Sequence, residues 1–252
     1  MANILVTAGG AGLGEAVAKA FIENGDTVFI RDINDEALGS FKAQHSDVHA
    51  IKADMGQAAD VDALFARIDA EVGGLDVLVN NAGIPGPRAA IEDITLEDWQ
   101  RSLDVNLTGA FRALQHAIPM MKSQRSGCIV NITTGSLKTG LPNRSAYIVS
   151  KSALAALSYN AARELGPWNI RCNTILPGLI ANERGKALVK TYGDERGLPP
   201  ERAEREFLSY FSMRSMIDPE EIAAVCVFLA SNHGRHITGQ SIGVDGNIEW
   251  EA

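Results

Sequence analysis

A tyrosine and a lysine lie one helical turn apart in the segment SAYIVSKSALAAL, which begins at Ser145. The spacing between Tyr147 and Lys151 places both side chains on one face of a helix. A tyrosine with its ordinary pKa of about 10 is a poor base at neutral pH, but a nearby ammonium group favours its phenolate form. The pair is therefore a candidate for proton transfer. Because Tyr-x-x-x-Lys also occurs by chance, this interpretation needs support from other motifs.

A glycine-rich segment, TAGGAGLG at residues 7–14, follows an apolar run and precedes a stretch with helical periodicity. Glycines let the backbone turn sharply and approach a pyrophosphate, whose charge is stabilised by the positive end of the following helix. The spacing departs from the strict Gly-x-Gly-x-x-Gly fingerprint, and a glycine turn between a strand and a helix is also found with a purely structural role. The predicted loop contacts are Thr7, Gly9, Gly12, Leu13 and Gly14.

An acidic residue, Asp32, stands eighteen residues after Gly14, at the end of the next apolar run. At that point a carboxylate accepts hydrogen bonds from the ribose hydroxyls of NAD and repels a 2′-phosphate. The sequence therefore predicts a dinucleotide site that prefers NAD. Strand alternation puts the preceding Arg31 on the opposite side, where we interpret it as a surface residue.

Two more segments follow predicted strands at the same edge of the sheet. Asp54, followed by Met55, is a candidate acceptor for an adenine amino group, with a solvated loop aspartate as the alternative. Asn81, Ala82 and Gly83 follow another strand, and open α/β sheets bind ligands beyond the carboxyl ends of their strands. Asparagine and glycine are also ordinary turn formers, so this motif supports a site only together with the others.

Short β-branched runs alternate with longer amphipathic segments along the chain, which is typical of βαβ units around a parallel sheet. Helical spacing of apolar residues is clear at Val17 and Phe21, for example. The pattern predicts an α/β fold of the Rossmann type, a doubly wound parallel sheet with helices on both faces. The expected strands are residues 3–7, 27–31, 48–52, 76–80, 127–133, 170–176 and 241–244.

The composition is that of a globular chain, with 252 residues, 46% hydrophobic and 21% charged. We expect one domain over residues 1–252, in the cytoplasm, because the apolar run at residue 4 leaves no room for a signal peptide and no stretch reaches 18 apolar residues. The net charge of -8 argues against nucleic-acid or membrane partners. Three cysteines, Cys128, Cys172 and Cys226, have no zinc-ligand spacing, so we expect reduced, buried thiols and no metal.

One segment, residues 179–216, is too long to be a simple connection, and we expect it to form a substrate lid. We predict two short helices joined by a Gly-Pro turn, the second over 201–213 with Phe207, Leu208 and Phe211 at helical spacing.

Charge gives little information about what this lid would bind. Between Glu183 and Arg214 there are seven Lys or Arg against six Asp or Glu, a net of +1, which is no basis for an anionic substrate. Arg184 is the residue best placed to meet a substrate carboxylate or hydroxyl. A salt bridge to a neighbouring acid is the alternative.

Taken together, these segments resemble the short-chain dehydrogenase/reductase family in its single-domain NAD(P)-dependent form, over essentially the whole chain. The resemblance implies Tyr147 as general acid/base, Lys151 as partner of the tyrosine and of the nicotinamide ribose, and Asn106 as the holder of a proton-relay water. It adds Pro177, Gly178 and Ile180 beside the nicotinamide. The motifs that carry it are residues 7–14, Asp32, residues 80–83, Asn106 in DVNLTG, Tyr147 with Lys151, and Pro177-Gly178.

Three positions depart from the family pattern. Ala8 stands where the family usually has the first loop glycine, which is tolerable if Ala8 has a negative φ. Thr134 stands thirteen residues before Tyr147, where the family places a catalytic serine, and its hydroxyl is both donor and acceptor. Ser136 is the alternative. Asn182 replaces the usual threonine after Pro177-Gly178.

The resemblance also implies a homodimer or homotetramer built on the helices that begin near Asn106 and Tyr147, with Trp250 as a second anchor. Small residues there would let helices approach closely across a twofold axis, and packing within one chain is the competing explanation. These small residues are Ala110, Ala113, Ala117, Ala153, Ala156 and Ala161.

The leading hypothesis is an NAD-dependent oxidoreductase that interconverts a secondary alcohol and a ketone or aldehyde, with Asn106, Thr134, Tyr147 and Lys151 as the catalytic set. The alternatives are a non-redox relative, such as a dehalogenase or lyase, and a dinucleotide-sensing regulator on the same fold.

Overall fold

Seven strands form one sheet in the computed structural model, which describes residues 1–249. All six strand pairs are parallel, and each expected strand is confirmed to within one residue at both ends. The strands are β1 (Asn3–Thr7), β2 (Thr27–Asp32), β3 (His49–Lys52), β4 (Val77–Asn80), β5 (Gly127–Ile132), β6 (Ile170–Pro177) and β7 (Ser241–Val244).

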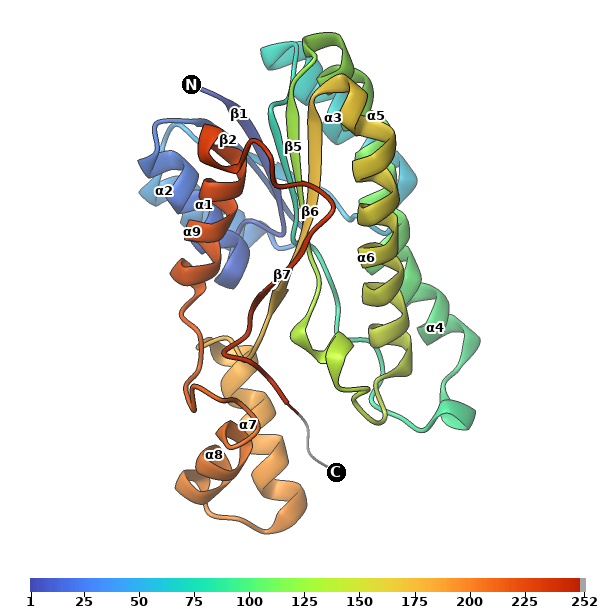
Figure 1. Ribbon diagram of the computed structural model, residues 1–252, viewed down its shortest axis with the longest axis vertical. Coiled ribbons are helices and arrows are strands. Elements are labelled where there is room, and N and C mark those ends of the chain that lie inside the picture. The colour runs from blue at the N-terminus through green and yellow to red at the C-terminus, as the bar shows by residue number, and fades with distance from the viewer. Residues whose placement is uncertain (250–252) are drawn as a thin grey trace.

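Helices cover both faces of this sheet (Figure 1). One layer contains α1 (Gly12–Glu23), α2 (Asp35–Gln44) and α9 (Pro219–Ala230); the other contains α3 (Ala58–Val72), α5 (Gly109–Gln124) and α6 (Ser145–Leu165). Side chains of β1 alternate between the layers: Ile4 and Val6 join the core under α1, and Leu5 joins the core under α3. The predicted doubly wound α/β domain is therefore confirmed.

The remaining helical segments lie in the connections. A helix over Leu96–Leu103 continues through a π-helical turn into α5, without a loop between them. These segments are η1 (Ile91–Asp93), α4 (Leu96–Leu103), η2 (Asp104–Thr108), η3 (Gly135–Lys138), η4 (Gly166–Trp168), α7 (Glu183–Arg196), α8 (Pro200–Leu208) and η5 (Asn232–Gly234).

The direction of winding reverses between β1 and β4. The strand order is β3-β2-β1-β4-β5-β6-β7, so the chain moves from β1 toward one edge and then returns to fill the other. In open parallel sheets the connections part at this reversal and leave a crevice beyond the carboxyl ends of the strands. The ends of β1 and β4 carry Thr7 and Asn80, so the predicted loop residues lie at this reversal.

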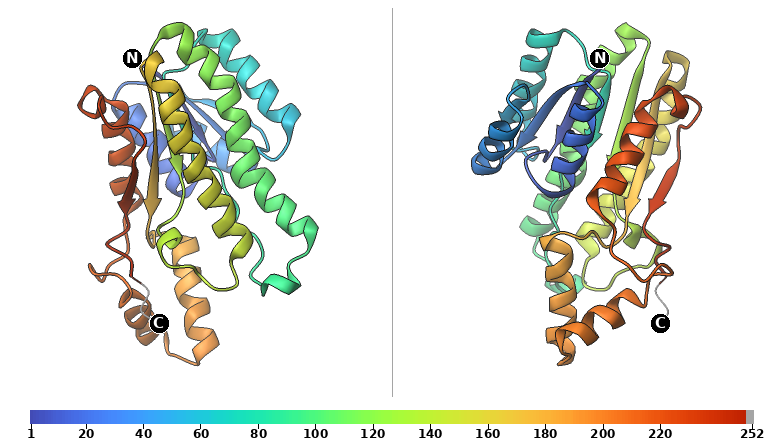
Figure 2. Two further views of the ribbon diagram at one scale, coloured as in Figure 1. Left: turned by 45° about the vertical axis from the view of Figure 1, so that its right-hand side comes forward. Right: turned by 90° about the vertical axis from the view of Figure 1, so that its left-hand side faces the viewer.

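The long segment before α9 contains the two expected helices, α7 and α8, which lie beyond the carboxyl end of β6 (Figure 2). A Cβ at Gly193 would lie 2.7 Å from Ala203 Cβ, so glycine permits their close packing. The second helix ends at Leu208 and not at residue 213. Phe211 instead forms a bridge with Ile248 and is buried against Leu179.

Cys128, Cys172 and Cys226 are free and buried, which confirms the expectation for the thiols. Within residues 1–249, no helix has the length and apolar character needed to cross a membrane. Trp250, the expected second anchor, lies outside the described residues.

The alanines assigned to a twofold interface are mostly buried inside the protomer. Ala110, Ala113, Ala117 and Ala161 are at most 6% exposed in the isolated chain. For these four residues the interface interpretation is wrong, because they pack α5 and α6 against the sheet and against neighbouring helices.

Candidate active site

The glycine loop between β1 and α1 forms a cradle that side chains would fill. A Cβ at Gly14 would lie 1.9 Å from the carbonyl oxygen of Ala8, and Gly12 has a φ of 57°, in the left-handed region. Ala11, which precedes α1, makes no side-chain bond to the helix, while Leu13 packs into the core below. The first amides of α1 therefore have no side-chain cap, and the cradle fits a pyrophosphate at a helix N-terminus.

Ala8 adopts a different conformation from the one expected. Its φ is 53°, so the expectation of a negative φ is wrong. The turn is held by Asn81, whose Nδ2 donates to the carbonyl oxygens of Thr7 and Ala8 at 3.1 and 3.2 Å, and by Gly9, whose amide donates to Arg31 O at 3.0 Å. A non-glycine residue in this region costs about 1–2 kcal/mol, which these bonds offset.

The Thr7 hydroxyl joins the ends of β1 and β4. Its Oγ1 donates to Val79 O at 3.3 Å and accepts from the amides of Asn81 and Ala82, both at 2.9 Å. The side chain is 1% exposed. Thr7 and Asn81 thus fix the two loops relative to each other.

Asp32 lies at the end of β2, beside the glycine loop. Its Oδ2 accepts from the amide of Gly10 at 3.2 Å, and its Oδ1 accepts from the amide of Asn34 at 3.1 Å. The carboxylate is half-buried. These bonds orient it toward the loop and leave acceptor capacity on both oxygens for a diol.

Arg31 is not a surface residue, so the interpretation made from strand alternation is wrong. It is 4% exposed and donates to Ala53 O at 2.8 Å. Burial lowers the pKa of Arg31 to about 10, against the opposing effect of Asp32, Asp54 and Asp60. The side chain points toward the segment that follows β3, and the negative charges of Asp32, Asp54 and Asp60 favour its charged form there.

Asp54 follows β3 and is held by two donors. Gly56 N and Arg101 NH2 each lie 2.8 Å from one of its carboxylate oxygens. Burial alone would raise the pKa of Asp54, but these donors, with Arg31, lower it below its ordinary value. Met55 is 2% exposed and packs against α5. The aspartate is therefore ionised and paired, in contrast to the solvated alternative.

Tyr147 and Lys151 lie one turn apart on α6, as expected. Lys151 is 3% exposed and its Nζ donates to Ile132 O, at the end of β5, at 2.9 Å. Burial, with a smaller contribution from the positive charge of Arg184, lowers the pKa of Lys151 from 10.5 to about 7. The Tyr147 ring is half-buried at the start of the same helix. Lys151 therefore lies one turn after the tyrosine on α6, and no carboxylate within residues 1–249 forms an ion pair with it.

Asn106 occupies the centre of the π-helical turn and is fully buried. Its Nδ2 donates to Ile84 O and Ser150 Oγ, each at 3.0 Å, and its Oδ1 accepts from Ile84 N at 2.7 Å. The side chain therefore joins the loop after β4 to α6, and both of its amide hydrogens are used. A π turn inside a helix is often found at functional sites. The role of Asn106 as holder of a water stays a prediction.

The loop after β4 touches both halves of the site. A Cβ at Gly83 would lie 3.0 Å from Lys151 Nζ and 3.3 Å from Asn106 Oδ1. Two residues earlier, Asn81 bonds the glycine loop. The structure thus brings the predicted dinucleotide loop and the Tyr147–Lys151 pair to one edge of the sheet.

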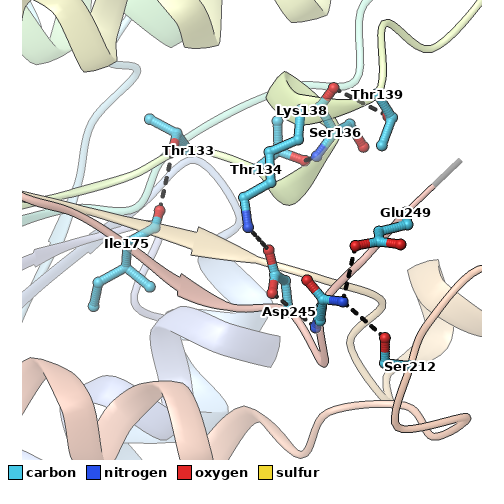
Figure 3. A network of polar contacts seen from close by, with 10 residues as sticks. Thr133, Thr134, Ser136, Lys138, Thr139, Ile175, Ser212, Asp245 and Glu249 are labelled. Atoms are coloured by element: carbon cyan, nitrogen blue, oxygen red, sulfur yellow. Dashed lines mark hydrogen bonds and ion pairs between the residues drawn. The ribbon is translucent and has the colours of Figure 1, made fainter.

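Thr134 and Ser136 follow β5 in the segment drawn in Figure 3. Thr134 is 8% exposed, and its Oγ1 accepts from Ser136 N at 3.2 Å as the N-cap of η3. In the same segment Lys138 Nζ lies 2.8 Å from Oδ2 of the buried Asp245, after β7. This ion pair ties η3 to the C-terminal segment, and the Thr134 hydroxyl hydrogen has no acceptor among the described residues.

The segment after β6 passes close to β7. Gly178 N donates to Val244 O at 3.0 Å, and a Cβ at Gly178 would lie 2.8 Å from Asp245 Cα. Pro177 ends β6 and Ile180 pairs with Ile217. Asn182 then caps α7, with Oδ1 accepting from Gly185 N at 2.9 Å. Its amide group also lies 3.9 Å from the Cβ position of Gly12, beside the glycine loop.

Sequence reasoning missed two residues at the site, Arg144 and Ser150. Arg144 directly precedes α6, and its Cζ lies 5.0 Å from the centre of the Tyr147 ring. The sequence contains a signal for Arg144, because this residue stands three positions before Tyr147 at a helix start. Ser150, which receives the bond from Asn106, was also passed over.

The chain belongs to the short-chain dehydrogenase/reductase family. The sequence model of a family described as enoyl-(acyl carrier protein) reductase matches residues 7–247, nearly the whole chain. The fold and the site described above agree with this assignment, and the protein is therefore a short-chain oxidoreductase.

Relatives of known activity cover the chain from end to end. A 2,5-dichloro-2,5-cyclohexadiene-1,4-diol dehydrogenase of Sphingobium indicum is 33% identical over 98% of this chain and 96% of its own. A 3-oxoacyl-(acyl-carrier-protein) reductase of Thermotoga maritima is 32% identical over 97% of this chain and 96% of its own. NAD⁺-bound xylitol dehydrogenase superposes with a TM-score of 0.90 at 31% identity, covering 98% of both chains. Levodione reductase superposes with a TM-score of 0.89 at 30% sequence identity, covering 97% of this chain and 96% of its own.

Proposed function

We propose that this protein is an NAD-dependent oxidoreductase that interconverts a secondary alcohol and a ketone or aldehyde, with Tyr147 as the general acid/base. The observation that carries the proposal is the buried Lys151 one turn from Tyr147, next to the loop that also bonds the glycine cradle. The named dehydrogenases and the NAD⁺-bound xylitol dehydrogenase support it.

NAD, when bound, supplies the hydride acceptor or donor of this chemistry. The residues that would hold the cofactor are those of the glycine loop after β1 and of the loop after β4, together with Tyr147 and Lys151 on α6. The Lys151 ammonium stabilises the phenolate of Tyr147, which takes the hydroxyl proton during oxidation and returns it during reduction. The proposed cofactor contacts are Thr7, Gly9, Gly12, Leu13, Gly14, Asp32, Asp54, Met55, Asn81, Ala82, Gly83, Tyr147, Lys151, Pro177, Gly178 and Ile180.

Thr134 is proposed to donate its free hydroxyl hydrogen to the substrate oxygen as negative charge develops there. Replacement of Thr134 by alanine is expected to lower kcat by about 100-fold or more, the usual effect of removing such a donor. Replacement by serine keeps the hydroxyl and should be mild. A larger loss in Ser136→Ala than in Thr134→Ala would show that Ser136 has this role.

The preference for NAD over NADP rests on Asp32, which is bonded to the loop amide of Gly10. A 2′-phosphate would meet this carboxylate, and Arg31 is buried and donates to Ala53 O, so it is not free to balance the phosphate charge. We expect kcat/KM with NAD to exceed that with NADP by about 100-fold, as two lost charged hydrogen bonds would give. Equal values with both cofactors would contradict this assignment.

The direct test of the activity is the change in absorbance at 340 nm when the protein is mixed with NAD and a panel of secondary alcohols. Tyr147→Phe should remove turnover and leave the Kd for NAD within a few fold, because the phenol acts in proton transfer and hardly in ground-state binding. A Tyr147→Phe variant with wild-type turnover would refute the proposed mechanism.

We also propose a homodimer or homotetramer. Three apolar or aromatic side chains on the outer faces of α5 and α6 support this: Phe111 and Val149 are each 43% exposed and Tyr159 is 58% exposed. These exposed side chains are available for contact with a second subunit. The buried alanines of the same helices play no part in the argument.

A further inference from the structure

Two guanidinium groups lie over the ring of Tyr147. Arg144 Cζ is 5.0 Å from the ring centre and Arg184 Cζ is 5.8 Å from it. They come from separate parts of the chain, because Arg144 precedes α6 and Arg184 is the second residue of α7. The fold therefore gathers two positive charges at the residue proposed to exchange the substrate proton.

Arg144 is buried without a carboxylate partner. It is 9% exposed, its NH2 donates to Pro85 O at 3.1 Å, and its Nε is buried with no hydrogen-bond partner. No ion pair within residues 1–249 includes it. A buried charge and a buried donor without partners are both costly, so this group has unused binding capacity.

Arg184 is the one base of α7 that the described residues leave unpaired. Lys186 pairs with Glu183 at 3.0 Å, Lys190 with Asp194 at 2.6 Å, and Arg196 lies 3.7 Å from Glu195. Arg184 is exposed, its Cζ lies 5.8 Å from the centre of the Tyr147 ring, and no ion pair within residues 1–249 includes it. The acids of α7 pair with other bases, so no carboxylate among residues 1–249 forms an ion pair with Arg184.

The other charges around this point do not cancel the two arginines. Lys151, buried one turn after the tyrosine on α6, adds a third basic group with no acidic partner among residues 1–249. Asp245, on the C-terminal side, is paired with Lys138, and Arg88 is paired with Glu195 at 2.9 Å. The substrate side of Tyr147 therefore carries a local excess of positive charge in a chain of net charge -8.

We propose that the substrate is a hydroxy acid or oxo acid, and that Arg144 and Arg184 bind its carboxylate while its reacting oxygen meets Tyr147. This inference rests on the proposed oxidoreductase function. Guanidinium groups suit a carboxylate because their planar donors match its two oxygens. In the oxidation, the hydrogen on the carbinol carbon leaves as hydride to NAD⁺, the hydroxyl proton passes to Tyr147, and the carbinol becomes a carbonyl. The carboxylate is unchanged.

The test uses matched pairs of substrates that differ in one charge. We would measure kcat/KM with NAD for 2-, 3- and 4-hydroxypentanoate and for the primary amide of each. Wild-type protein should favour at least one acid over its amide by about 10- to 100-fold, the value of a charged hydrogen bond. Arg184→Gln should remove most of this preference by lowering kcat/KM for the acid and leaving the amide within about threefold.

Lys190→Gln is the matched control, because it removes one positive charge from the same helix at a paired, exposed position. It should leave both substrates unchanged. Arg144→Gln should have the same effect as Arg184→Gln. Because Arg144 is buried, the Arg144→Gln variant is at risk of misfolding; Arg184 is exposed, so the Arg184→Gln variant still tests the proposal in that case. Titration of the acid into the enzyme–NADH complex, followed by NADH fluorescence, should show a Kd raised by about 10-fold or more in Arg184→Gln.

Three results would overturn the inference. Wild-type protein that oxidises the amides or neutral polyols as well as the acids has no carboxylate site, although the proposed activity then stands. An equal loss for acid and amide in Arg184→Gln, with a raised Kd for NAD, would assign Arg184 to the cofactor. Absence of any Tyr147-dependent turnover, with acids or neutral alcohols, would refute the proposed function as well.

Discussion

Replacement of Lys151 by methionine is expected to stabilise the cofactor-free protein at neutral pH while removing activity. The folded pKa of Lys151 is about 7 and its ordinary value is 10.5, because burial opposes the charged form. This difference corresponds to a destabilisation of about 5 kcal/mol below pH 7. Between pH 7 and pH 10.5 the unfolded chain binds the extra proton, so stability rises with pH across that interval. The charge is held at a cost to folding, as is common at active sites.

The change in unfolding free energy follows from two contributions. Methionine removes the buried charge. It also removes the hydrogen bond that Lys151 Nζ donates to Ile132 O at 2.9 Å, and the unpaired carbonyl lowers the stability of the variant by about 2 kcal/mol. We therefore expect Lys151→Met to be more stable than wild type by about 3 kcal/mol at pH 6 and about 2 kcal/mol at pH 7, and less stable by about 1 kcal/mol at pH 10.

Urea unfolding followed by circular dichroism at pH 6, 7, 8, 9 and 10 measures this difference. Lys190→Met is the control, because Lys190 is 76% exposed and should show no change with pH beyond about 0.5 kcal/mol. A stability difference for Lys151→Met that does not vary with pH would refute the reasoning. So would a variant that is less stable than wild type at pH 6, because the buried ammonium would then carry no cost.

Further predictions follow from single features of the structure. Ala8→Gly should stabilise the protein by about 1 kcal/mol in urea unfolding, because Ala8 has a φ of 53°; a loss of stability would contradict the strained turn. Burial raises the pKa of Cys128 to about 11 and of Cys172 to about 12, and also raises that of Cys226, so a disulfide reagent at pH 8 should label none of them until the protein unfolds. Light scattering at micromolar concentration should give two or four times 26.9 kDa, and a monomer would overturn the proposed assembly.

Local sequence patterns were sufficient to predict the sheet and the placement of several candidate site residues at one edge of it. Strand bounds were right to within one residue because apolar runs buried on both faces stand out from amphipathic helices. The Tyr147–Lys151 pair was readable because its geometry depends only on the pitch of one helix. The loops after β1 and β4 were brought together as expected, since parallel strands align their carboxyl ends.

Other features depended on contacts between distant segments. The φ of Ala8 follows from the bond that Asn81 makes to its carbonyl, 73 residues away. Arg31 was taken as exposed because alternation gives only the side of the strand, and it is buried because the segment after β3 covers that side. Helix α8 ends at Leu208, earlier than predicted, because Phe211 pairs with Ile248. None of these outcomes has a local signal.

By itself, the sequence determined the fold class, the position of the glycine loop after β1 and the placement of Tyr147 and Lys151 one turn apart on a helix, because periodicity and short-range spacing encode them. The tertiary structure alone decided which charges are neutralised. A count over residues 183–214 gives a net of +1, yet ion pairing leaves Arg184 free at Tyr147 and burial leaves Arg144 beside it. Pairing and desolvation depend on distances of a few ångströms between remote segments, and those distances set the electrostatics of the site.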